Sequence, residues 1–133
     1  MNALDGLLTS SRQTIVGAVL ALVFLFSSTA MAQTISYAKD VFPILELRCV
    51  ECHQPGGDGF EKSGLNLLTY AGLMKGTKFG PVVVPRNAMT SNLIAVIDHR
   101  TNKKIWMPHE RRQLSSCERR ALRFWIDQGA RDN

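Results

Sequence analysis

The chain has 133 residues, 45% of them hydrophobic and 20% charged, which is enough for one compact domain and argues against a disordered polypeptide. Its 16 Lys and Arg residues outnumber its 11 Asp and Glu residues, so the net charge is +5 and acidic partners are favoured. The export signal described next argues against nucleic acid as that partner.

Residues 1–32 have the pattern of a secretory signal peptide. An uncharged apolar run at residues 14–26 follows a polar start, and Ala30 and Ala32 form a small-x-small cleavage site. The run is shorter than the roughly 20 residues that a membrane-spanning helix needs. We therefore predict a removable signal peptide helix at 1–32 and a mature periplasmic domain at 33–133. The alternative is an uncleaved segment that anchors the protein to the membrane, facing the periplasm.

The first helix of the mature domain is predicted over residues 40–52. Asp40 is a suitable cap for its N-terminus, and Pro43 is tolerated in its first turn. Four apolar residues of this segment are expected to face the core: Val41, Ile44, Leu45 and Val50. The helix would carry two cysteines at its C-terminal end.

Two shorter helices are predicted next, at residues 69–75 and 90–99. Gly76 would end the former, and a cluster of apolar residues marks the latter: Leu93, Ile94, Val96 and Ile97. The β-branched residues 82–84 lie between two prolines, which cannot donate to a sheet, so they indicate an extended loop. Glycine- and proline-containing loops are predicted at 56–59, 76–85 and 102–109.

The last helix has the clearest start of the four. Ser115 and Glu118 are spaced as a capping box, and Gly129 would end the helix. Its core-facing side carries Leu122, Trp125 and Ile126. Four helices and no strand predict an all-α fold.

The segment Cys49-Val50-Glu51-Cys52-His53 carries the chemistry. Two cysteines at this spacing can form thioether bonds to the two vinyl groups of one haem, and the adjacent histidine can bind the iron from the proximal side. We therefore predict covalent haem attachment at Cys49 and Cys52, with His53 as an iron ligand. The third cysteine, Cys117, falls in the first turn of the last helix.

Three other interpretations of the cysteine pair are weaker. A dithiol redox pair would need a thioredoxin-like βαβ pattern, and a zinc site would need further Cys or His ligands at short spacing, but neither is present. A disulfide is the ordinary state of two cysteines in an oxidising compartment. The histidine that directly follows Cys52 argues against it.

The ligand on the distal side of the iron is a separate question. Thioether and imidazole are the usual distal ligands, so the candidates are Met74, Met89, His99, Met107 and His109. Met107 lies between Trp106, which can cover a porphyrin, and Pro108, which prevents helix continuation. We predict Met107 as the distal ligand and His109 as the runner-up. His99 is expected to end the third helix.

Several stretches occur in a fixed order around the haem motif: 41–45 before it, then 63–67, 72–76, 80–85, Met107-Pro108, Leu114-Ser115 and 125–130. In these residues the mature chain resembles the planctomycete-type cytochrome c domain, a variant of the class I cytochrome c fold. The resemblance implies a small helical fold around one covalently bound haem. It also implies His and Met axial ligands, which carries over to His53 and Met107.

The predicted function is transfer of single electrons between redox proteins, without catalysis or a small-molecule substrate. The alternatives are a haem-bearing subunit of a larger exported complex and, with an open distal position, a small peroxidase or gas sensor. Basic side chains bracket the Met107 loop and would form a rim that attracts acidic partners: Arg100, Lys103, Lys104, Arg111, Arg112, Arg119, Arg120 and Arg123. Membrane contact is expected only through an uncleaved N-terminal segment.

Overall fold

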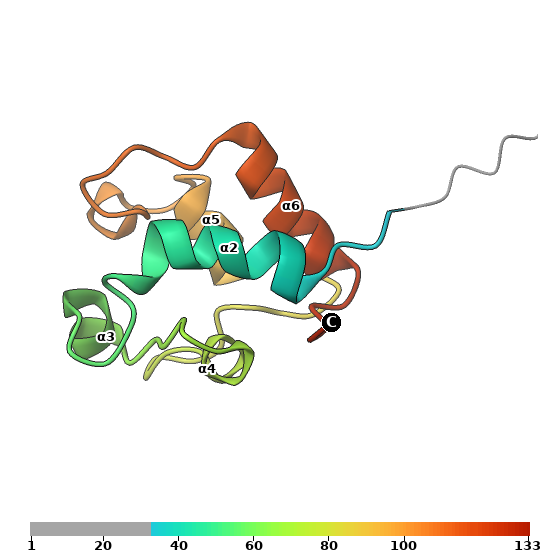
Figure 1. Cartoon of the computed structure of the whole chain (residues 1–133). Coiled ribbons are helices and arrows are strands. Elements are labelled where there is room, and N and C mark those ends of the chain that lie inside the picture. Colours follow the sequence, from blue (N-terminus) through green and yellow to red (C-terminus); the bar gives the residue numbers. More distant parts are fainter. Residues whose placement is uncertain (1–32) are drawn as a thin grey trace, which may run out of the picture. The chain divides into compact units, whose positions relative to one another are not determined.

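The computed structural model describes residues 33–133, of which 34–133 form one compact unit (Figure 1). The predicted signal peptide, including its cleavage motif, lies outside the described residues. Residues 33–133 contain five α-helices and no named strand, which confirms the predicted all-α fold. Among these residues, no helix combines the length and apolar character needed to cross a membrane.

The first helical segment is continuous from Tyr37 to Val50. It consists of the wider turns η1 (Tyr37–Val41), the α-helical turn α2 (Phe42–Leu45) and the wider turns η2 (Glu46–Val50). We call these residues the first rod. Figure 1 shows the rod lying across the unit, with α3 (Asp58–Ser63) and α4 (Tyr70–Lys75) below it.

The rod begins earlier than predicted, and its cap is Ser36 rather than Asp40. The Ser36 hydroxyl accepts a hydrogen bond from the Lys39 N–H at 3.2 Å, and the Asp40 carboxylate accepts one from the Ser36 N–H at 2.8 Å. The two reciprocal bonds satisfy two backbone N–H groups at the start of the helix, whereas a single capping bond would satisfy one. Asp40 therefore supports the Ser36 cap from within the first turns.

The apolar side of the rod faces the core as predicted. Val41 and Leu45 are completely buried, Val50 is nearly so, and Ile44 is partly buried. The rod's start is tied to the end of the chain, because the Ala38 N–H donates to the Asn133 carbonyl at 3.1 Å. This contact holds the first and last described segments together.

Helix α6 (Ser116–Asp127) has the predicted capping box and core face. The Ser115 hydroxyl accepts from the Glu118 N–H, and the Glu118 carboxylate accepts from the Ser115 N–H. Three core residues of this helix are at most 1% exposed: Leu122, Trp125 and Ile126. The Trp125 ring lies 5.5 Å from the Tyr37 ring, so α6 and the rod share one core.

Two of the remaining helices agree with prediction and two were missed. Helix α4 (Tyr70–Lys75) has the predicted bounds within a residue, and α5 (Asn92–Ile97) is a shorter form of the helix predicted at 90–99. Helix α3 (Asp58–Ser63) and the 3₁₀ turn η3 (Lys103–Ile105) lie where only loops were predicted. Residues 82–84 form no strand, as predicted.

The missed helix α3 has a local physical cause. Two acidic residues, Asp58 and Glu61, lie in its first turn, where the helix dipole favours negative charge. The Phe60 N–H also donates to the Cys52 carbonyl at 2.9 Å, so the helix is held against the preceding segment. Three glycines at 56–59 suggested a loop because helix propensity ignores such tertiary support.

Candidate functional site

The two cysteines and the histidine of the haem motif lie in a single turn at the end of the first rod. The N–H groups of Cys52 and His53 both donate to the Cys49 carbonyl, at 3.2 and 3.0 Å. We call residues 49–53 the attachment turn. Cys49 is partly buried and Cys52 is exposed, and both are free thiols. The turn therefore presents two unpaired sulfurs beside one imidazole.

The two thiols differ in environment. Burial raises the pKa of the Cys49 thiol to about 11, and the neighbouring Arg48 only partly opposes this effect. Cys49 is therefore a protonated thiol at neutral pH and not an activated thiolate. No group of three or more His, Cys, Asp or Glu residues within 33–133 is arranged to hold a metal ion.

His53 is buried, with only 9% of its surface exposed. Burial lowers the pKa of His53, and the backbone of Leu65 offsets part of this shift. Nδ1 of the buried ring has no hydrogen-bond partner of ordinary geometry. A buried ring nitrogen without a partner is uncommon in folded proteins. The neutral imidazole that results is the form that binds metals.

The His53 ring lies directly against Gly59 of helix α3. A Cβ atom at position 59 would be 2.8 Å from Cε1 of the ring and 2.9 Å from the Cys52 carbonyl oxygen. On the other side of the histidine, the Leu67 N–H donates to the His53 carbonyl at 2.8 Å. Helix α3, which the sequence did not predict, therefore frames the imidazole.

Met107 lies in the loop between α5 and α6 and packs against the core, partly buried. Its N–H donates to the Val96 carbonyl at 3.2 Å. The adjacent Trp106 ring stacks on the His99 ring, with centroids 4.4 Å apart and the planes within 2°. Trp106 is predicted to cover a porphyrin, whereas in the structure its ring stacks on His99.

The other candidate ligands differ in burial. The His109 side chain is 57% exposed and lies 3.9 Å from the Glu110 carboxylate. Met89 is 71% exposed, whereas Met74 is partly buried against the core. His99 lies in the turn that ends α5, as predicted, two residues beyond the last helical residue, Ile97. Of Met107 and His109, only Met107 packs against the core.

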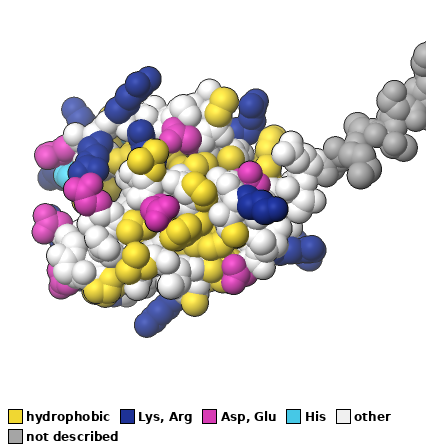
Figure 2. All heavy atoms as spheres, in the orientation of Figure 1, with side chains coloured by type: hydrophobic (Ala, Val, Ile, Leu, Met, Phe, Trp, Pro, Cys, Tyr) yellow, Lys and Arg dark blue, Asp and Glu magenta, His cyan; other side chains and the backbone are white. Residues whose placement is uncertain are grey.

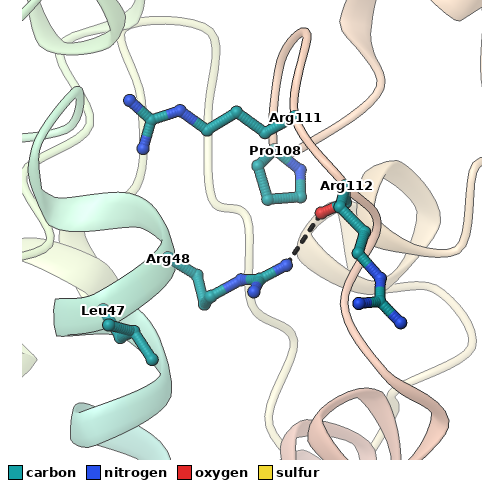
Figure 3. Close-up of a pocket in the computed structure, with 5 residues that line it drawn as sticks. All are labelled: Leu47, Arg48, Pro108, Arg111 and Arg112. Atoms are coloured by element: carbon teal, nitrogen blue, oxygen red, sulfur yellow. Dashed lines mark hydrogen bonds between the residues drawn. The ribbon is translucent and has the colours of Figure 1, made fainter.

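Arg48 joins the attachment turn to the Met107 loop. Its guanidinium reaches from the rod across to the loop and donates to the Arg112 carbonyl at 2.8 Å (Figure 3). A cavity of about 310 Å³ lies between the two segments, lined by Leu47, Arg48, Pro108, Arg111 and Arg112. The immediate neighbours of Cys49 and of Met107 thus line one cavity.

A second connection joins the same two segments. Arg111 donates from both terminal nitrogens to the two oxygens of Glu51, each at 3.0 Å. The hydrogen bonds from Arg111 lower the pKa of the Glu51 carboxyl, so the pair stays charged at neutral pH. Glu51 lies between the two cysteines, so this pair connects the attachment turn to the segment that follows Met107.

The predicted basic rim is only partly available. Three of its arginines, Arg100, Arg119 and Arg123, surround the Asp98 carboxylate, whose side chain is 6% exposed. Arg111 is occupied by Glu51. The buried Asp98 carboxylate requires compensating charge, whereas the Arg111–Glu51 pair is exposed. The rim itself stays a prediction. Lys103, Lys104, Arg112 and Arg120 are exposed and have no ion pair among the described residues.

The residues present fit a covalently bound haem. The attachment turn supplies two free thiols and a buried imidazole, and Gly59 leaves room where a larger residue would press on the ring. Met107 supplies a neutral thioether from a loop joined to that turn. These are the donor types that hold haem iron in electron-transfer proteins.

Comparison with protein families gives one match. Residues 49–110 match the family described as Planctomycete cytochrome C. The matched region begins at Cys49 and includes both the attachment turn and Met107. Comparisons with curated proteins and with solved structures gave no match.

We predict that Gly59→Ala displaces the His53 imidazole and lowers the free energy of unfolding by about 1–3 kcal/mol, as overpacking usually does. Denaturant unfolding measures the loss, and the visible absorption spectrum reports the histidine. Lys62→Ala, an exposed change on the same helix, is the control. Unfolding and spectra that match the control would contradict the close contact between Gly59 and His53.

Proposed function

Because the chain carries a planctomycete-type cytochrome c domain, we propose that it is an exported monohaem c-type cytochrome that passes single electrons between redox proteins. The attachment turn carries this proposal, since it places two free thiols and a buried imidazole together. Haem, when bound, supplies an iron that accepts and releases one electron. The proposal makes the protein an electron carrier and not an enzyme.

The attachment chemistry proposed for Cys49 and Cys52 is an addition. Cys49 and Cys52 would hold the haem through thioether bonds, each formed by addition of an S–H group across one vinyl group. No electrons are gained or lost, so no oxidant is required. The raised pKa of the Cys49 thiol keeps its S–H bond intact at neutral pH.

The proposed axial ligands are His53 and Met107. Burial keeps the His53 imidazole neutral, and the Met107 thioether is neutral at every pH. Two occupied axial positions leave no position for a substrate, which favours electron transfer over peroxidase chemistry or gas sensing. His109 is the alternative distal ligand, although its exposed position gives the fold less control over it.

The proposed docking surface lies where the attachment turn meets the Met107 loop. Leu47, beside the turn, is 77% exposed, and the exposed Arg112 lines the cavity beside it. An exposed apolar residue next to exposed positive charge suits a transient complex with an acidic redox partner. In Figure 2 hydrophobic side chains gather in the middle of the visible face, with both basic and acidic side chains around them.

The intact mass of the denatured protein tests export, attachment and haem number together. We expect the mass of a chain that begins at Gln33 plus one haem, because the thioether bonds survive denaturation. A chain that begins at Met1 and carries haem would favour the anchored alternative. Haem that separates from the chain would contradict the central proposal.

Met107→Ala is expected to abolish the ferric sulfur-to-iron charge-transfer band, lower the reduction potential and allow carbon monoxide to bind the ferrous protein. The reason is that a neutral thioether favours ferrous iron more than water or imidazole does. Absorption spectroscopy and redox titration measure these changes. Met89→Ala, at an exposed methionine, is the matched control and should behave as wild type.

His109 provides the competing result. If His109 is the native ligand, wild-type protein should show bis-histidine spectra, and Met107→Ala should change nothing. If His109 only replaces a missing Met107, the Met107→Ala protein stays low-spin until His109→Ala is added. The first result would overturn the Met107 assignment, and the second would leave it intact.

Arg112→Gln is expected to slow electron exchange with an acidic partner by about two- to five-fold at low salt and to weaken its salt dependence, because opposite charges steer encounter. Stopped-flow kinetics over a range of ionic strengths gives both quantities. Lys39→Gln removes the same charge at the opposite end of the first rod and should have little effect. Equal effects of the two variants would show that only net charge matters.

A further inference from the structure

His99 has a backbone conformation that is unusual for its residue type. Its φ angle is +58°, in the left-handed region that glycine adopts freely and other residues rarely do. The His99 N–H donates to the Val96 carbonyl at 3.3 Å, and the Arg100 N–H donates to the Ala95 carbonyl at 2.9 Å. These two bonds form the helix-ending turn in which the left-handed position is normally glycine.

The His99 side chain makes two contacts that glycine could not make. Its ring stacks on Trp106, and its Nε2 atom lies 3.3 Å from the Met107 carbonyl oxygen. A carbonyl only accepts hydrogen bonds, so Nε2 must carry the hydrogen in this contact. The left-handed turn directs the imidazole back toward the loop that follows.

Both backbone groups of Met107 are therefore held by the end of α5. The Met107 N–H donates to the Val96 carbonyl, and the Met107 carbonyl accepts from His99. Trp106 is fixed separately, because its indole N–H donates to the Thr101 carbonyl at 2.9 Å. With its backbone held at both groups, Met107 can direct its side chain within a narrow range.

We propose that His99 is a positioning residue for the distal ligand: its imidazole holds the Met107 backbone so that the sulfur is presented in one direction. The inference rests on the proposed role of Met107 as an iron ligand. A strained histidine in place of glycine is consistent with this role, since strain persists where the surrounding structure requires the residue. Without the imidazole, Met107 should leave the iron more often.

The test is titration of the ferric, haem-loaded protein with free imidazole. Imidazole binds only molecules from which Met107 has dissociated, so its apparent affinity increases with that fraction. We expect His99→Gly to bind imidazole about five-fold more tightly, which corresponds to the loss of one neutral hydrogen bond. Glycine keeps the left-handed turn without strain, so folding should be retained.

Two matched controls separate positioning from general destabilisation. Arg86→Gly makes the same kind of change at another left-handed residue, whose φ angle is +66°, in the loop that precedes α5. Lys104→Ala removes an exposed side chain from the loop that carries Met107. Both variants should bind imidazole as wild type does, and their charge-transfer bands should be unchanged. His99→Asn, which also tolerates the left-handed region but has a shorter side chain, should resemble His99→Gly.

The outcomes distinguish failure of this inference from failure of the ligand assignment. If Met107→Ala loses the charge-transfer band while His99→Gly binds imidazole no more tightly than Arg86→Gly, the positioning role is wrong and Met107 remains the ligand. If Met107→Ala leaves the band and the imidazole affinity unchanged, Met107 is not the ligand and both proposals fail. Tighter imidazole binding in both His99 variants, with both controls unchanged, supports the positioning role.

Discussion

The packing of the first rod against α6 is the contact on which the rest of the structure depends. Val41 and Leu45 are fully buried, and Tyr37 meets Trp125 across the interface. Hydrogen bonds to Asn133 hold the start of the rod at the end of the chain. With one end fixed in this way, the other end delivers the attachment turn to the side of the fold where the Met107 loop returns.

The candidate site is assembled from three segments that are distant along the chain. The attachment turn supplies thiols and an imidazole, helix α3 supplies the space beside that imidazole, and the loop before α6 supplies a thioether. Arg48 and the Glu51–Arg111 pair join the first segment to the third. Because exposed ion pairs contribute little on their own, the buried core and backbone hydrogen bonds must hold the arrangement.

The positive charge of the chain is divided between two roles. Three arginines compensate the buried Asp98 carboxylate, which joins the end of α5 to α6. Asp98 directly precedes His99, so the same turn connects the charge cluster and the Met107 loop. The proposed docking surface therefore depends on the basic side chains of the rim that lie outside these ion pairs.

The sequence by itself determined the attachment turn, the all-α fold and the capping box of α6, because each depends on residues close together in the chain. It predicts Met107 as the distal ligand through its immediate neighbours, Trp106 and Pro108. Only the tertiary structure decided the contacts of Gly59, His99 and Asp98, because their partners lie on other segments. A local sequence pattern indicates which interactions a residue can make. Contacts between distant segments decide which of these interactions it does make.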